Sequence, residues 1–257
     1  MGLRLTGSIF VVLCALSATA LAQNAQQPAA GKPNLNGIWG TPLREQAPEV
    51  NKRFPPFKRE AASLTPWAQE IFTYNRDPRP GFDFRPELNP EYKCIPESPV
   101  RLLQGVASYD FLEIIQTPKR VLLIFQRDHT IRQIWTDGRK LPPVDEVDPS
   151  WMGQSIGRWD GDSLIVETVG FKTGNWVIPG VPHTEDLRMT ERYRRVDNYL
   201  QIDVTVEDPR IFAKPWSTRV IRILNPEAEL YPDSRCYQGD AETKAQEELF
   251  INPLPAR

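Results

Sequence analysis

The chain has 257 residues, of which 40% are hydrophobic and 25% charged, and its formal net charge at pH 7 is −2. A net charge so close to zero does not indicate a protein that binds nucleic acid or an anionic membrane surface, so we expect neither as a partner. The length is sufficient for one sizeable core, and all-β barrels often reach it as a single domain.

The first 22 residues have the pattern of a cleaved signal peptide. A positively charged start precedes a short apolar run at 9–16, and Ala20-Leu21-Ala22 offers the small-x-small cleavage site. The apolar run is too short to span a bilayer as a helix. Leu13 before Cys14 also does not fit a lipidation motif. We therefore expect a periplasmic or secreted protein, cut after Ala22, with no membrane insertion after cleavage.

Two cysteines, Cys94 and Cys236, remain after that cleavage. In an oxidising compartment the default interpretation of such a pair is a disulfide, which here would tie the N-terminal part to the end of the last strand. The alternative is a catalytic or metal-bound thiol. No C-x-x-C motif and no neighbouring histidine supports it.

The N-terminal third has little periodicity and many prolines. Residues 23–34 are rich in Gln, Ala and Pro and predict a disordered leader. Because proline cannot donate to a β-ladder, residues 35–100 predict an extended arm packed on a barrel. One short helix is expected within it at about 65–75, with Thr65 as N-cap and Pro66 at the first helical position.

Residues 101–240 carry the alternating pattern of β-strands separated by turn residues, and 241–257 form a tail. Asp160-Gly161 predicts a two-residue type I′ hairpin turn. With a strand at Gly37, the pattern predicts an all-β fold, an antiparallel meander that closes into a roughly eight-stranded barrel. A barrel of that size can hold one small ligand. The strands are expected at 109–116, 120–127, 130–136, 154–159, 163–171, 186–196, 199–208 and 216–224.

Gly37-x-Trp39 at the start of this meander resembles the signature of lipocalins and the wider calycin superfamily. That resemblance implies that Trp39 plugs one end of the barrel and that Arg219 or Arg222 packs across it. The chain also resembles a group of secreted bacterial proteins of unassigned function, which implies a lipocalin-like barrel and no nameable reaction. The shared motifs are Asp128-His129-Thr130-x-Arg132-Gln133-Ile134, Asp137-Gly138-Arg139, Trp151-Met152-Gly153-x-Ser155-Ile156-Gly157-Arg158-Trp159 and Thr190-Glu191-Arg192-Tyr193-Arg194-Arg195.

The candidate catalytic residues are two histidines, His129 and His183, both at junctions between loops and strands. If the loops around 139–152 and 172–183 meet over one barrel mouth, the two imidazoles could act as general acid and base. The carboxylates that could orient them are Asp137, Asp145, Asp148, Glu185 and Asp186. The simpler alternative is that each histidine satisfies a local hydrogen bond. No metal is expected, because neither H-x-H nor H-E-x-x-H spacing occurs, and no nucleotide motif implies a cofactor.

Three tryptophans are the best sequence evidence for a ligand. Trp135, Trp151 and Trp176 fall at a strand end or in the long connections, and an indole offers broad apolar area to a hydrophobic molecule. The first hypothesis is therefore a periplasmic barrel that binds a small apolar or aromatic molecule in its mouth. The alternative is a cofactor-free lyase, isomerase or hydratase that uses the histidine pair. A structural or interaction domain of the cell envelope is a second alternative.

Overall fold

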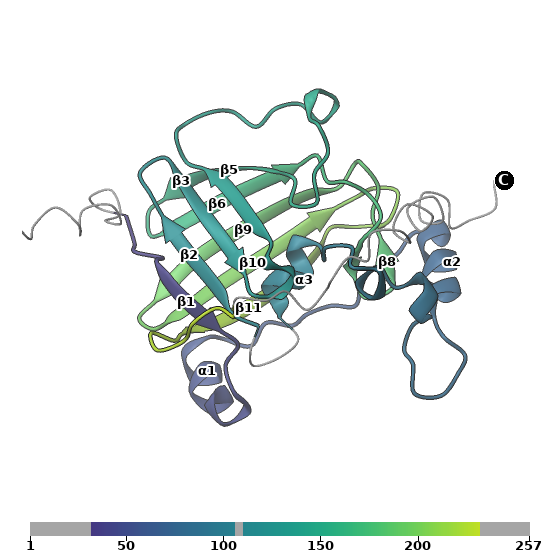
Figure 1. Cartoon of the computed structure of the whole chain (residues 1–257), viewed down its shortest axis with the longest axis horizontal. Helices are drawn as coiled ribbons and strands as arrows, with labels where there is room; N and C mark the ends of the chain where they lie inside the picture. Colours follow the sequence, from purple (N-terminus) through teal and green to yellow (C-terminus); the bar gives the residue numbers. More distant parts are fainter. Residues whose placement is uncertain (1–31, 106–109, 232–257) are drawn as a thin grey trace, which may run out of the picture.

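A closed barrel of nine strands organises the computed structural model, which describes residues 32–105 and 110–231 (Figure 1). The predicted all-β barrel is confirmed. The eight later ranges and the strand at Gly37 together make nine strands, one more than the roughly eight predicted, and β1 closes the ring by pairing with both β2 and β11. The strands, in their order around the barrel, are β1 (Gly37–Gly40), β11 (Trp216–Leu224), β10 (Tyr199–Glu207), β9 (Arg188–Val196), β6 (Ser163–Val169), β5 (Gln154–Asp160), β4 (Ile131–Trp135), β3 (Arg120–Phe125) and β2 (Leu112–Gln116).

One strand pair departs from the predicted antiparallel meander. β4 and β5 run parallel, and only Ile134–Ser155 and Trp135–Ile156 are paired in register. Parallel neighbours need a long crossover, and residues 136–153 supply it by arching over the outside of the barrel (Figure 1). The sequence pattern showed two strands and a long connection, but it did not show which end of the barrel the connection returned to.

The hairpin between β5 and β6 also differs in detail from its prediction. Asp160 pairs with Ser163, so the two turn residues are Gly161 and Asp162. Only Gly161 has a positive φ, of 58°. A type I′ turn needs positive φ at both central positions, whereas glycine at the first central position is typical of type II′.

Side chains fill the middle of the barrel. Alternate residues point inward along each strand, as the period of two requires. The inward positions of β2, β3 and β10 are buried without interruption. Large side chains such as Phe125, Tyr193 and Ile202 are almost completely inaccessible there. The barrel is therefore a packed core.

The arm is more helical than the sequence indicated. The predicted helix is confirmed as α2 (Pro66–Asn75), and the Thr65 hydroxyl accepts a hydrogen bond from the Ala68 amide at 3.2 Å. Two further short helices, α1 (Ala47–Arg53) and α3 (Pro99–Gln104), begin with proline in the first turn. The 3₁₀ turns lie at Arg44–Gln46, Pro86–Leu88, Pro90–Lys93, Arg127–His129 and Val144–Glu146.

The two ends of the barrel are built differently. At the turn end, short loops join β2 to β3, β5 to β6 and β9 to β10. At the arm end lie the connections from β6 to β9 and from β10 to β11, and the first of these includes a small hairpin of β7 (Trp176–Ile178) and β8 (Val181–Pro182). α2 and β8 lie at this arm end, on the right of Figure 1, and α3 lies nearer the centre of the view. Within the described residues, no helix is both long and apolar enough to cross a membrane.

Trp39 lies at the turn end, fully buried, and its indole N–H donates to the Leu35 carbonyl at 3.0 Å. The cation over its ring is Arg195 of β9, at 5.4 Å from the ring centroid. Neither predicted arginine takes this place. Arg219 faces outward and pairs with Asp203, while Arg222 points inward near the other end of the barrel.

Candidate functional site

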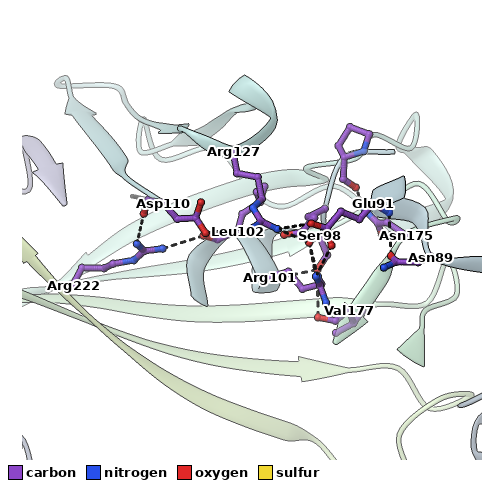
Figure 2. Close-up of polar contacts among 12 residues, drawn as sticks. Asn89, Glu91, Ser98, Arg101, Leu102, Asp110, Arg127, Asn175, Val177 and Arg222 are labelled. Carbon is purple, nitrogen blue, oxygen red and sulfur yellow. Dashed lines mark hydrogen bonds and ion pairs between the residues drawn. The ribbon is translucent and has the colours of Figure 1, made fainter. Parts of the chain in front are cut away.

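The arm end is closed by ion pairs between the arm and the barrel. Arg127, after β3, lies 3.2 Å from Glu91 and 3.5 Å from Asp110 (Figure 2). It also lies 3.0 Å from the buried Glu97, which Arg101 contacts at 2.5 Å. These side chains link the 3₁₀ turn Pro90–Lys93, α3 and the rim of the barrel into one polar cluster.

Arg222 fastens α3 into the barrel beside this cluster. Its guanidinium donates to the carbonyls of Leu102 at 3.1 Å and Asp110 at 2.6 Å (Figure 2). It also donates to the Leu103 carbonyl at 2.7 Å. Burial lowers the pKa of Arg222 to about 10, and the Asp110 carboxylate opposes that shift. Near neutral pH Arg222 is therefore still a cation. Because α3 also buries Leu103 in the core, it occupies the mouth where the sequence placed a ligand.

His183 is held in place by local contacts on both ring nitrogens. It is 5% exposed, Nδ1 lies 2.9 Å from the Thr184 carbonyl, and Nε2 lies 2.9 Å from Asn175 Oδ1. Burial lowers the pKa of His183, while the Thr184 carbonyl and the charges of Asp208 and Glu185 oppose this. A ring whose nitrogens are both engaged has none left for a substrate.

His129 lies at the same end of the barrel, in the turn between β3 and β4. Its φ is 45°, and Nε2 lies 3.4 Å from the Gln126 amide nitrogen. Two of the five carboxylates expected to orient the histidines are bonded elsewhere. Asp137 binds Arg139 beyond the opposite end of β4, and the exposed Glu185 pairs with Arg210 at 3.6 Å. The acid–base pair stays a prediction that these contacts do not support. No three or more His, Cys, Asp or Glu residues gather as metal ligands in the part of the chain that the structure describes.

The three candidate tryptophans are not brought together. Trp176 is buried edge-on against Phe84 of the arm, with ring centroids 5.3 Å apart. Trp151 is half-buried, packs on the core and lies under the Lys172 ammonium at 4.7 Å. Trp135 lies on the outer face of β4. The two long connections meet where Ser150 bridges Phe171, and they pack against each other there.

A charged network inside the barrel escaped the sequence analysis. Arg132 of β4 and Glu191 of β9 form an ion pair with both side chains 0% exposed, through contacts of 2.8 and 2.5 Å. Tyr193 donates to Glu191 at 2.6 Å, and Arg132 also donates to Ser155 and Thr168. Burial, with the Glu191 charge, raises the pKa of Tyr193, so its phenol stays protonated. Arg132, Glu191 and Tyr193 alternate with outward-facing residues along their strands, in step with buried apolar positions. This alternation was the feature of the sequence that could have predicted their burial.

A groove on the outer face of the barrel is a further candidate site. It has a volume of about 450 Å³ and lies between β4, the start of β5 and the connection 136–153. That volume falls within the range of small-molecule sites, about 300–1,000 Å³. Its apolar lining comprises Ile131, Trp135, Pro142, Met152 and Ile156.

The strand register explains why this groove exists. β5 begins opposite Gln133, so the first residues of β4 have no strand beside them on that side. The connection bridges this gap, and its end is fixed by hydrogen bonds from the Ser150 amide to the Gly170 carbonyl and from the Lys172 amide to the Ser150 carbonyl. Ile131 is consequently 60% exposed at the groove.

Comparison with family models, with curated proteins and with solved structures gave no match to this chain. The functional conclusions therefore depend on the geometry of the site alone.

Proposed function

We propose that this protein binds a small molecule with an apolar body in the groove on the outer face of β4 and β5. The observation that carries the proposal is a cavity of about 450 Å³ that leaves Ile131 60% exposed beside Trp135 and Met152. A ligand that covered Ile131 and Trp135 would remove apolar surface from water. The site lies outside the barrel, because α3 and inward side chains occupy the mouth.

Secretion and a calycin-like relationship belong to the same proposal. The signal-like segment 1–22 supports secretion, although it lies outside the described residues. The Cys94–Cys236 disulfide also stays a prediction, because Cys236 lies outside them too. The closed barrel, with Trp39 plugging one end beneath Arg195, supports the calycin-like relationship.

The test is a calorimetric titration of the mature protein with naphthyl and short alkyl compounds. We expect saturable binding of at least one class, and Ile131→Ser should weaken it about fivefold, since covering part of an isoleucine contributes about 1 kcal/mol. The matched control is Leu43→Ser, because Leu43 is 44% exposed in the arm and does not line the groove.

Two results would reject this function. The first is the absence of saturable binding by any compound. The second is an equal loss of affinity in the Ile131 and Leu43 variants. The first result would leave the packed barrel as a structural or interaction domain, which was the second alternative from the sequence. The second would show that the compounds bind elsewhere than in the groove.

A further inference from the structure

The groove carries an excess of positive charge, although the whole chain is slightly negative. Arg139 and Lys140 line it, and none of the described residues that line it is acidic. Arg120 adds a third cation at the edge, where it donates to Gln133 at 2.9 Å and lies 5.9 Å from the Trp135 ring centroid. Because Asp137 offsets only one of these three charges, the groove favours an anion.

Arg139 is held in one orientation before any ligand arrives. Its guanidinium lies 3.7 Å from the centroid of the Trp135 ring. Asp137 accepts hydrogen bonds from Nε at 2.9 Å and from Nη2 at 2.6 Å. The Asp137 carboxylate also raises the pKa of Arg139, so the guanidinium keeps its charge.

One nitrogen of this fixed guanidinium remains available. Nη1 makes no hydrogen bond to any of the described residues, and the Arg139 side chain is 45% exposed. A guanidinium that is already ordered loses little conformational entropy when it binds an anion. Charge-assisted hydrogen bonds from arginine are also among the stronger polar contacts that proteins make.

We propose that the ligand of the groove is a small organic acid. Its carboxylate accepts from Arg139 Nη1 and from the Lys140 ammonium, and its apolar body lies against Ile131 and Met152. This inference rests on the proposed function of the groove and names the class of ligand. It also explains why cations and exposed apolar side chains lie together on one outer face.

The experiment compares two probes of nearly equal shape, 2-naphthoate and neutral 2-naphthylmethanol, titrated into the mature protein at low ionic strength. The wild type should bind the acid about tenfold more tightly than the alcohol, since one charge-assisted hydrogen bond contributes about 1.5 kcal/mol or more. Added salt should reduce this preference, because the cations face solvent.

Variants separate a specific contact from a general charge effect. Arg139→Gln should reduce the preference for the acid over the alcohol to about twofold, and Lys140→Gln should reduce it partly. The matched control is Arg194→Gln, because Arg194 is also half-exposed and paired with an aspartate, Asp162, but does not line the groove. The preference of the Arg194→Gln variant for the acid over the alcohol should equal that of the wild type.

The outcomes distinguish this inference from the function on which it rests. Equal binding of acid and alcohol by the wild type would overturn the inference and leave the groove as a binding site. A preference that survives in Arg139→Gln would overturn the assigned role of Arg139. If neither probe nor any compound of the wider titration bound, the proposed function itself would fail.

Discussion

The buried pair of Arg132 and Glu191 should be the point in the barrel most sensitive to a change of charge. In Glu191→Gln the side chain keeps its shape but loses its charge. Glu191 accepts from both terminal nitrogens of Arg132 and from Tyr193. A glutamine amide nitrogen at either position would face a donor, and the Arg132 guanidinium would be a buried cation without a counter-ion.

Removing one partner of a buried ion pair costs about 3–5 kcal/mol of the free energy of unfolding. For a domain of this size the melting temperature should then fall by roughly 10 °C. Urea and thermal denaturation followed by circular dichroism would measure both quantities. The matched control is Glu167→Gln on β6, an outward and exposed position, where the free energy of unfolding should change by less than about 0.5 kcal/mol.

Two results would refute this reasoning. If Glu191→Gln and Glu167→Gln had equal effects, the buried pair would contribute nothing specific. The other result concerns the double variant Arg132→Met with Glu191→Leu, which removes both charges. It should recover most of the free energy of unfolding that Glu191→Gln loses. A double variant less stable than Glu191→Gln would show that the loss came from packing rather than from an unpaired charge.

Three further predictions follow from single contacts. Because burial lowers the pKa of His183, the unfolded chain takes up a proton at a higher pH than the folded chain, so stability should decline as the pH falls below about 6.5. Thermal melting at several pH values should show a smaller decline in His183→Gln, and equal slopes would contradict this. Gly170→Ala should destabilise by more than about 2 kcal/mol, because φ is 70° and the new Cβ would lie 2.3 Å from Val147. Gly138→Ala, with positive φ but open space, should cost only about 1 kcal/mol in the same urea titration, and equal losses would contradict the steric explanation. Arg222→Met should lower the free energy of unfolding by about 3 kcal/mol, because it leaves the carbonyls around α3 without donors. Proteolysis of the arm should become faster in this variant. An unchanged cleavage rate would contradict the role of Arg222 in holding α3.

Local signals determined much of the architecture. β11 occupies the predicted residues 216–224, and α2 begins after its Thr65 cap and ends at Asn75 as predicted. The other barrel strands lie within about three residues of their expected ends, because alternation, turn residues and caps act over a few neighbouring residues. The small hairpin of β7 and β8, in the connection expected at 172–183, was not predicted. The sequence therefore predicted an all-β barrel and the positions of its strands.

Contacts between distant residues decided the rest. The parallel pairing of β4 and β5 depends on the path of residues 136–153, and the closed mouth depends on Arg222 reaching α3, 119 positions earlier in the chain. The groove follows from that pairing, since it leaves the start of β4 uncovered beneath the connection. Alternation along a strand shows which residues share a face. Only the closed barrel shows which strands face one another, and this is why the sequence predicted the elements while the tertiary structure located the candidate site.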